Sequence, residues 1–306
     1  MPLPEPDEVI QAAGPWTHRD VSANGARFHA VDIGSGPAVV LLHGFPTFWW
    51  TWRRQLTELA AAGFRAIAMD LRGYGGSDHP PEGYDPRTLA SDVASFIRSL
   101  GISQAIIVGH GWGGLAAWST AVLEPEVVGG IVPVSMPHPR RLRAAMMSNH
   151  RQRKAMHYAM GFQLPFAPER SLTANDGQRV ADLIRSWSAD PAWLDDEAAT
   201  AYRAAFLRWP TAHTAIEYHR WAVRSALRPD GLSYMSLMEA PVQCPVLQVQ
   251  GVSDPMMLSS SVDGSEDFVR AEYQRADMDC GHFPHEERPA EFTRTLLDWL
   301  TGPALR

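Results

Sequence analysis

The stretch that decides the fold is residues 105–118, AIIVGHGWGGLAAW. An apolar, β-branched run ends at Val108, a glycine-rich turn follows, and residues that favour a helix begin at Leu115. This order predicts a strand, a sharp turn and a helix, the arrangement in which a nucleophilic side chain projects from the turn. The residue three positions after Val108, where that side chain is expected, is Gly111. The sequence therefore predicts a nucleophile elbow without a nucleophile.

Short apolar runs and amphipathic segments alternate on both sides of this turn, which predicts an α/β fold whose mostly parallel sheet is covered by helices on both faces. Between Pro137 and Met238 no strand-like run occurs, and the composition favours helices. We expect a core domain, residues 1–136 and 239–306, interrupted by a helical cap, residues 137–238. The expected strands are Val39–Leu42, Ala66–Met69, Gln104–Val108, Ile131–Val134, Val246–Val249 and a segment around Ala271–Ala276; the expected helices are Trp52–Ala61, Thr88–Ser99 and Pro289–Leu300.

Composition and charge narrow the class of function. The chain has 306 residues, 45% of them hydrophobic, and a formal net charge of -7, which argues against a nucleic-acid partner. The basic runs at 140–143 and 151–154 are interpreted as a solvated helix face. No signal peptide and no run long enough to span a bilayer is evident. We expect a cytoplasmic protein with a small apolar substrate and no membrane partner, and leave a homodimer open.

Neither a metal nor a cofactor is expected. Cys244 and Cys280 are too few for a disulfide framework and are interpreted as buried free thiols. His282 and His285 lie three residues apart, but no HExxH motif or third ligand accompanies them.

The glycine turn also admits a second interpretation. Gly109, Gly111 and Gly114 match the dinucleotide fingerprint G-x-G-x-x-G after a strand and before a helix. That fingerprint needs an acidic residue about 20 positions later to hold the ribose, and residues 127–168 contain no Asp or Glu. It also belongs to the first βαβ unit, whereas at least two strands precede this one. The elbow is therefore the favoured interpretation.

A second turn supplies candidate oxyanion donors. Residues 41–46, LLHGFP, place His43 and Phe45 directly after a predicted strand. The backbone N–H of Phe45 and that of Trp112, the residue after the elbow position, are expected to form an oxyanion hole. His43 is included as a candidate substrate-binding residue.

An acid and a histidine follow late in the chain. Asp254 comes just past the strand expected at 246–249, and His282 lies in the loop before the last helix. The chain order elbow, acid, histidine is that of the α/β-hydrolase fold. We expect His282 to act as the catalytic base and Asp254 to orient it.

Over nearly its whole length the chain resembles the epoxide hydrolases and related dehalogenases of the α/β-hydrolase superfamily, especially actinobacterial epoxide hydrolases. The stretches that carry the resemblance are HGFPTFWWTWRRQL (43–56), AMDLRGYGGSD (68–78), GHGWGG (109–114), the Asp-Pro after the late strand and GHFPHEERP (281–289).

The resemblance implies that the cap donates two tyrosines to the epoxide oxygen. Residues 157–165 are similar to the family's Tyr-x-x-x-Phe-Gln-x-Pro stretch, which points to Tyr158. Residues 217–220, EYHR, are loosely similar to its Asn-x-Tyr-Arg stretch, which points to Tyr218. Here Ile216 replaces the asparagine, and the arginine falls one residue late.

The same resemblance implies that an aspartate at the elbow attacks the epoxide, and that the resulting ester is hydrolysed by water activated by histidine. Gly111 cannot form that ester. His110, one residue earlier, is expected to point away from the nucleophile direction. Three explanations remain open. The first is hydrolysis by water that His282 and Asp254 activate directly. The second is a ligand-binding, regulatory or catalytically impaired relative, or one that catalyses a non-hydrolytic proton transfer, and the third is an epoxide hydrolase whose nucleophile was removed by substitution.

Overall fold

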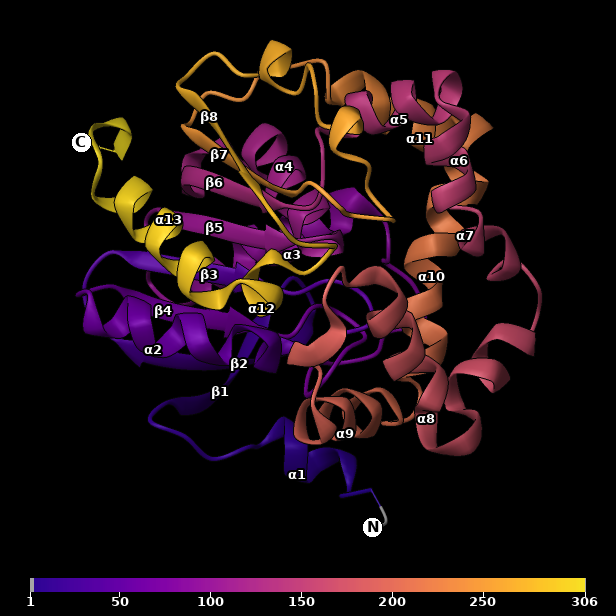
Figure 1. Ribbon diagram of the computed structural model, residues 1–306. Helices are drawn as coiled ribbons and strands as arrows, with labels where there is room; N and C mark the ends of the chain where they lie inside the picture. Colours follow the sequence, from indigo (N-terminus) through magenta and orange to yellow (C-terminus); the bar gives the residue numbers. More distant parts are fainter. Residues whose placement is uncertain (1–2, 306) are drawn as a thin grey trace.

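A single eight-stranded sheet forms the centre of the computed structural model, which describes residues 3–305 (Figure 1). The strand order is β1-β2-β4-β3-β5-β6-β7-β8. Strand β2 runs antiparallel to both of its neighbours, β1 and β4, and the neighbouring pairs from β4 to β8 are parallel. The strands are β1 (Thr17–Ala23), β2 (Ala26–Gly34), β3 (Ala38–Leu42), β4 (Arg65–Met69), β5 (Ala105–His110), β6 (Val128–Val134), β7 (Val246–Gly251) and β8 (Tyr273–Met278).

The central strands are apolar because helices cover both faces of the sheet. Every residue of β3 and of β7 is buried, as expected for parallel strands packed on both sides. Helices α2 (Arg53–Ala61) and α13 (Pro289–Thr301) pack against each other on one face, and α3 (Pro86–Ser99) and α4 (Trp112–Leu123) do so on the other (Figure 1). The predicted α/β architecture, including each of its six strands, is confirmed.

The antiparallel edge of the sheet was not predicted. Strands β1 and β2 form a hairpin whose two turn residues, Asn24 and Gly25, both have positive φ values, 44° and 73°. An Asn-Gly pair is the preferred sequence for such a two-residue turn, because its backbone twist matches that of the flanking strands. This pair was the signal in the sequence that could have revealed the hairpin.

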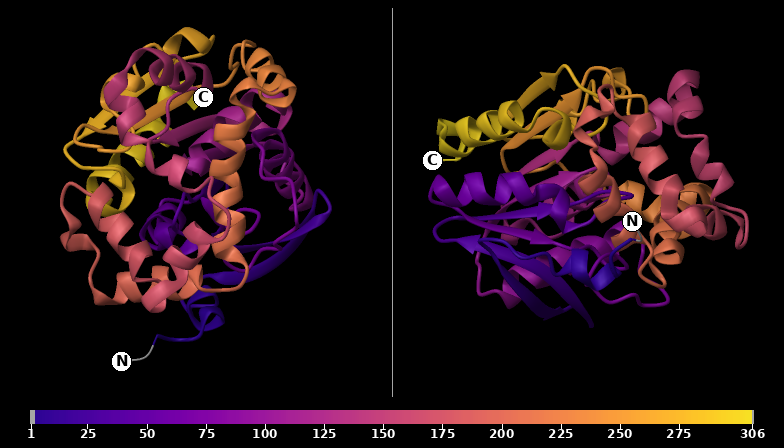
Figure 2. Two further views of the ribbon diagram at one scale, coloured as in Figure 1. Left: turned by 90° about the vertical axis from the view of Figure 1, so that its right-hand side faces the viewer. Right: turned by 60° about the horizontal axis from the view of Figure 1, so that its bottom comes forward.

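A helical insert occupies the chain between β6 and β7 and covers the edge of the sheet at the carboxyl ends of the parallel strands (Figures 1 and 2). No strand lies within it in the part of the chain that the structure describes. Its helices are α5 (Pro139–Ser148), α6 (His150–Ala155), α7 (Tyr158–Gly161), α8 (Ala167–Trp187, interrupted by non-helical residues 174–177), α9 (Asp196–Phe206), α10 (Thr211–Arg224) and α11 (Pro229–Leu237).

The N-terminal helix α1 (Pro6–Ile10) joins the insert to the core. It packs against α9, and Asp7 forms an ion pair with Arg208 in the loop after that helix (3.5 Å). On the core side, the indole N–H of Trp49 donates a hydrogen bond to the carbonyl oxygen of Ile10 (2.9 Å), and Ile10 is fully buried. Helix α1 therefore contacts both layers at once.

Candidate active site

The elbow forms at the end of β5, where Gly111 adopts φ +52° and ψ −114°. Such a backbone is strained for any residue with a side chain, and it is what turns the strand sharply into α4. The other glycines of the turn are accounted for by close packing. A Cβ atom on Gly113 would lie 2.3 Å from the Leu42 carbonyl oxygen, and one on Gly114 would lie 2.8 Å from Met136 Cβ.

The late acid and histidine meet beside this turn. His282 Nδ1 lies 2.7 Å from Asp254 Oδ2, and both residues are buried. The other carboxylate oxygen accepts the backbone N–H groups of Met256 (2.7 Å) and Met257 (2.9 Å), which fixes the carboxylate. Since Asp254 is an acceptor, the Nδ1–H tautomer of His282 is held and Nε2 is left free to take a proton.

The free nitrogen of His282 faces the apex of the elbow. A Cβ atom built on Gly111 would have two neighbours within 4 Å, Gly44 Cα at 3.7 Å and His282 Nε2 at 3.8 Å. These are ordinary van der Waals distances, so the apex has room for a side chain or a water molecule. The structure thus brings base, acid and elbow together, with no reactive side chain on the elbow.

The candidate oxyanion donors lie at the same apex. Gly44 is in contact distance of it, and Phe45 is the next residue of that turn. Trp112 is the first residue of α4, where a backbone N–H has no partner within the helix. His43 does not face the apex. Its Nε2 accepts a hydrogen bond from the backbone N–H of Leu71 (3.0 Å). The ring of His43 is therefore part of the core and supports the turn on the side away from the apex.

The cap contributes Tyr158 from α7 and, unexpectedly, His219 from α10. Tyr158 Oη lies 3.1 Å from His219 Nε2, and the indole N–H of Trp112 donates to the same nitrogen (3.3 Å). His219 Nδ1 lies 3.2 Å from the carbonyl oxygen of Ala215, an acceptor only. Neutral His219 therefore carries its proton on Nδ1 and accepts two hydrogen bonds at Nε2.

Tyr218 is not placed where the resemblance implied. Its hydroxyl donates to the carbonyl oxygen of Arg72 (2.6 Å), and its ring packs beneath Trp112 with centroids 5.3 Å apart. Tyr218 and His219 are adjacent on a helix, so their side chains point about 100° apart, and only His219 meets Tyr158. The position assigned from the loose match to the family stretch is therefore one residue too early. The arginine that falls one residue late in this sequence was the signal that could have revealed the shift.

His110 and His285 lie behind the base. His110 Nε2 lies 2.8 Å from the carbonyl oxygen of His282, to which it donates, and His285 Nε2 lies 2.8 Å from Thr51 Oγ1. Burial lowers the pKa of both histidines well below the usual range, with the neighbouring His282 as the next cause. Within residues 3–305, no group of three or more His, Cys, Asp or Glu side chains is arranged to hold a metal ion.

A family model described as the alpha/beta hydrolase family matches residues 39–295, more than four fifths of the chain. The chain belongs to the alpha/beta hydrolase family. The expected resemblance to epoxide hydrolases is also confirmed, and the protein is an epoxide hydrolase-like member of this family of hydrolases.

Three relatives show how this α/β hydrolase compares with known proteins. It is 31% identical to epoxide hydrolase 3 of Xenopus tropicalis, over 90% of this chain and 75% of that protein. It is 30% identical to bifunctional epoxide hydrolase 2 of Sus scrofa over 92% of this chain, which spans about half (54%) of that longer protein. The crystal structure of epoxide hydrolase A from Mycobacterium thermoresistibile superimposes with a TM-score of 0.79 at 28% identity, covering 94% of this chain and 98% of that one.

Burial sets the protonation of the cap residues in this α/β hydrolase. It lowers the pKa of His219 to about 4, so the imidazole is neutral at pH 7. It also raises the pKa of Tyr158, with the negative charge of Asp254 as a second cause, so the phenol keeps its proton and remains a donor.

Acid is expected to destabilise the protein through His219. Between about pH 6.5 and pH 4 the unfolded chain binds a proton on this histidine and the folded chain does not, so stability is lost as the pH falls. By pH 5 the contribution is about 2 kcal/mol. Urea unfolding at pH 8 and pH 5 measures it. The drop in the free energy of unfolding should be about 2 kcal/mol smaller for His219→Gln; an equal drop would contradict the neutral assignment.

Proposed function

We propose that this α/β hydrolase adds water to a small apolar epoxide without forming an ester on the chain. One observation supports this most directly. The unprotonated nitrogen of His282, held by Asp254 at 2.7 Å on its other side, lies 3.8 Å from the point where a Gly111 side chain would begin. Because Gly111 has no side chain, a water molecule is able to lie in front of His282 Nε2 at hydrogen-bond distance, where the base is already oriented.

In the proposed reaction, His282 Nε2 removes a proton from this water as its oxygen attacks an epoxide carbon. The carbon–oxygen bond of the ring breaks, and its electron pair goes to the ring oxygen. The proton that His282 removed from the water is then returned to that oxygen, which completes a diol, and Asp254 stabilises the imidazolium in the interval. The stoichiometry is one epoxide and one water for one diol.

The ring oxygen needs donors as charge develops on it. The hydroxyl of Tyr158 and the indole N–H of Trp112 already converge on one acceptor, His219 Nε2. We assign them to the ring oxygen in the bound state, with His219 holding both donors in place when no substrate is bound. We assign the backbone N–H groups of Phe45 and Trp112 to the attacking water, since the two turns that carry them meet at the Gly111 apex.

This mechanism predicts a slow enzyme. General-base catalysis contributes roughly 10² to 10⁴-fold, and no covalent nucleophile adds to it. The absence of a side chain at Gly111 equally favours a second candidate, a protein that uses the same pocket to bind an apolar ligand without turning it over.

The experiment compares diol formation from styrene oxide and from aliphatic epoxides by the purified protein and by its His282→Ala variant. We expect the variant to lose all activity above the uncatalysed rate, whereas His213→Ala, which removes an exposed histidine, should not. If the native protein forms no more diol than His282→Ala, the binding function is the correct one.

Oxygen labelling then decides the mechanism. With protein in excess over epoxide in ¹⁸O water, direct attack places ¹⁸O in every diol formed in the first turnover. Unlabelled diol in that turnover would show that a protein carboxylate supplied the oxygen, and would overturn the proposal.

A further inference from the structure

The outer edge of the cap gathers cations. The cap ridge is defined here as residues 147–170, which run from the end of α5 through α6 and α7 to the first turn of α8. Arg151, Arg153, Lys154 and Arg170 are exposed on it, and residues 127–168 contain no acid. The whole chain carries a formal net charge of -7, so this concentration of positive charge is local.

The cations of the cap ridge are not neutralised by acids in the described part of the chain. Among residues 3–305, none of the four takes part in an ion pair, and Arg153 donates instead to the carbonyl oxygens of Met146 and Met147. Glu169 is the acid at the end of the ridge, and it is paired with Arg220 (2.8 Å). The ridge is thus free to meet an anionic surface.

The same ridge exposes large apolar side chains. Met147 is 75% exposed, Met160 52%, Leu164 57% and Phe166 72%. Single exposed apolar residues are normal on a protein surface, but here four lie on one segment of 24 residues that also carries four exposed cations. Basic and large apolar side chains together are the combination that adsorbs to a membrane interface.

The ridge is also the outer wall of the active site. In Figure 1, α6 and α7 run along the right-hand edge of the molecule, and the left view of Figure 2 looks at that side directly. Helix α7 begins at Tyr158, whose hydroxyl points inward to His219.

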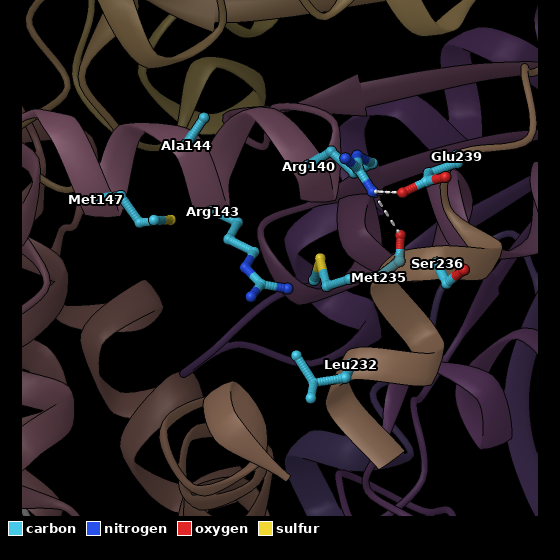
Figure 3. Close-up of a pocket in the computed structure, with 8 residues that line it drawn as sticks. All are labelled: Arg140, Arg143, Ala144, Met147, Leu232, Met235, Ser236 and Glu239. Carbon is cyan, nitrogen blue, oxygen red and sulfur yellow. Dashed lines mark hydrogen bonds and ion pairs between the residues drawn. The ribbon is translucent and has the colours of Figure 1, made fainter. Parts of the chain in front are cut away.

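A shallow hollow adjoins the ridge, between α5 and α11. Arg143 extends into it toward Met235 and Leu232, and Met147 stands at its edge (Figure 3). Arg140 on the same helix is bound to Glu239 and to the carbonyl oxygen of Met235. The hollow therefore adds one more cation without an acidic partner, next to apolar side chains.

We propose that the cap ridge binds to an anionic lipid surface. The cations lie at the level of the lipid phosphates, and Met160, Leu164 and Phe166 insert among the headgroups. No helix within residues 3–305 is long and apolar enough to cross a bilayer, so the contact is one of adsorption to the surface. The sequence-based expectation of no membrane partner considered only spanning segments. Binding does not depend on the proposed hydrolysis, although it would place an apolar substrate beside the site.

Flotation with lipid vesicles tests the proposal on the full chain. We expect the protein to float with vesicles that contain about 30% phosphatidylglycerol at low salt, and to be released at about 0.5 M salt. Each Lys or Arg near such a surface contributes about a fivefold factor, so the triple variant R151Q/R153Q/K154Q should bind about 100-fold more weakly. The variant M160S/L164S/F166S should also lose binding.

Matched variants show whether binding depends on the cap ridge itself or only on the total charge and hydrophobicity of the protein surface. R179Q/R270Q/R294Q removes three exposed cations, and L227S/L237S/V252S three exposed apolar residues, all outside the ridge. Both should float as the native protein does. Failure to float with anionic vesicles, equal binding to pure phosphatidylcholine, or equal losses in the matched variants would each overturn the proposal, whatever the enzyme assay shows.

Discussion

Gly111→Asp is expected to raise epoxide turnover on the order of 10³-fold. Removal of a nucleophile from an otherwise intact site costs up to about 10⁶-fold in other enzymes, and general-base catalysis in the native protein already recovers roughly 10² to 10⁴-fold of that loss. The Cβ atom of the introduced side chain would lie 3.8 Å from His282 Nε2, and Tyr158 and Trp112 still converge on His219 as candidate donors to the ring oxygen. The reaction would then pass through an ester, which His282 and Asp254 would hydrolyse. The positive φ at this position should lower stability by about 1–3 kcal/mol.

Rates of diol formation and mass spectrometry of the protein check this prediction. Repeated turnover in ¹⁸O water should label the introduced carboxylate, and combining the substitution with His282→Ala should accumulate the ester. Gly111→Asn provides the matched control, because it has the same shape and the same backbone strain without a carboxylate. A Gly111→Asp protein that folds but gains no activity would show that the cap has been reshaped for another ligand.

Asp254→Asn is expected to lower the native activity by about 10² to 10⁴-fold. The backbone N–H groups of Met256 and Met257 select the amide oxygen on their side, so the NH₂ group would face His282 Nδ1. His282 would then carry its proton on Nε2, and the nitrogen nearest Gly111 could no longer accept one.

Initial rates of diol formation for the two proteins, with thermal unfolding to verify folding, measure this loss. Asp263→Asn is the matched control, since Asp263 is an exposed acid that pairs with Arg275 and not with His282. Activity within a few-fold of the native rate in Asp254→Asn would exclude the His282–Asp254 pair as the base.

The sequence was sufficient to predict those strands and helices that are determined by local hydrophobic pattern. Strand β3 and helix α13 were expected from apolar runs and from amphipathic spacing, and the structure has them within one residue of each expected end. Gly111, Asp254 and His282 could be selected because each follows a strand or precedes the last helix, and their chain order implies that they meet.

The cap residues could not be assigned in the same way. Which of two neighbouring helical side chains faces the core depends on how the helix is rotated against α4 and α7, and no local pattern fixes that rotation. The buried hydroxyl of Tyr218 donates to the carbonyl oxygen of Arg72, and His219 is the side chain that faces Tyr158. Residue type alone favoured Tyr218 as the partner of Tyr158, but the packing of the helix places His219 in that position.

The position of α1 has a mechanical consequence. The insert is continuous with the core at two points, the chain before α5 and the chain after α11, and these lie close together (Figure 1). Rotation of the insert about that short axis is opposed at its far end by α1, whose Asp7 pairs with Arg208 of the insert while Ile10 accepts a hydrogen bond from Trp49 of the core. Hydrogen bonds from Thr214 to the carbonyl oxygen of Gly73 and from Tyr218 to that of Arg72 oppose the same rotation. We therefore expect the site to open by local displacement of α6 and α7 and not by rotation of the whole insert.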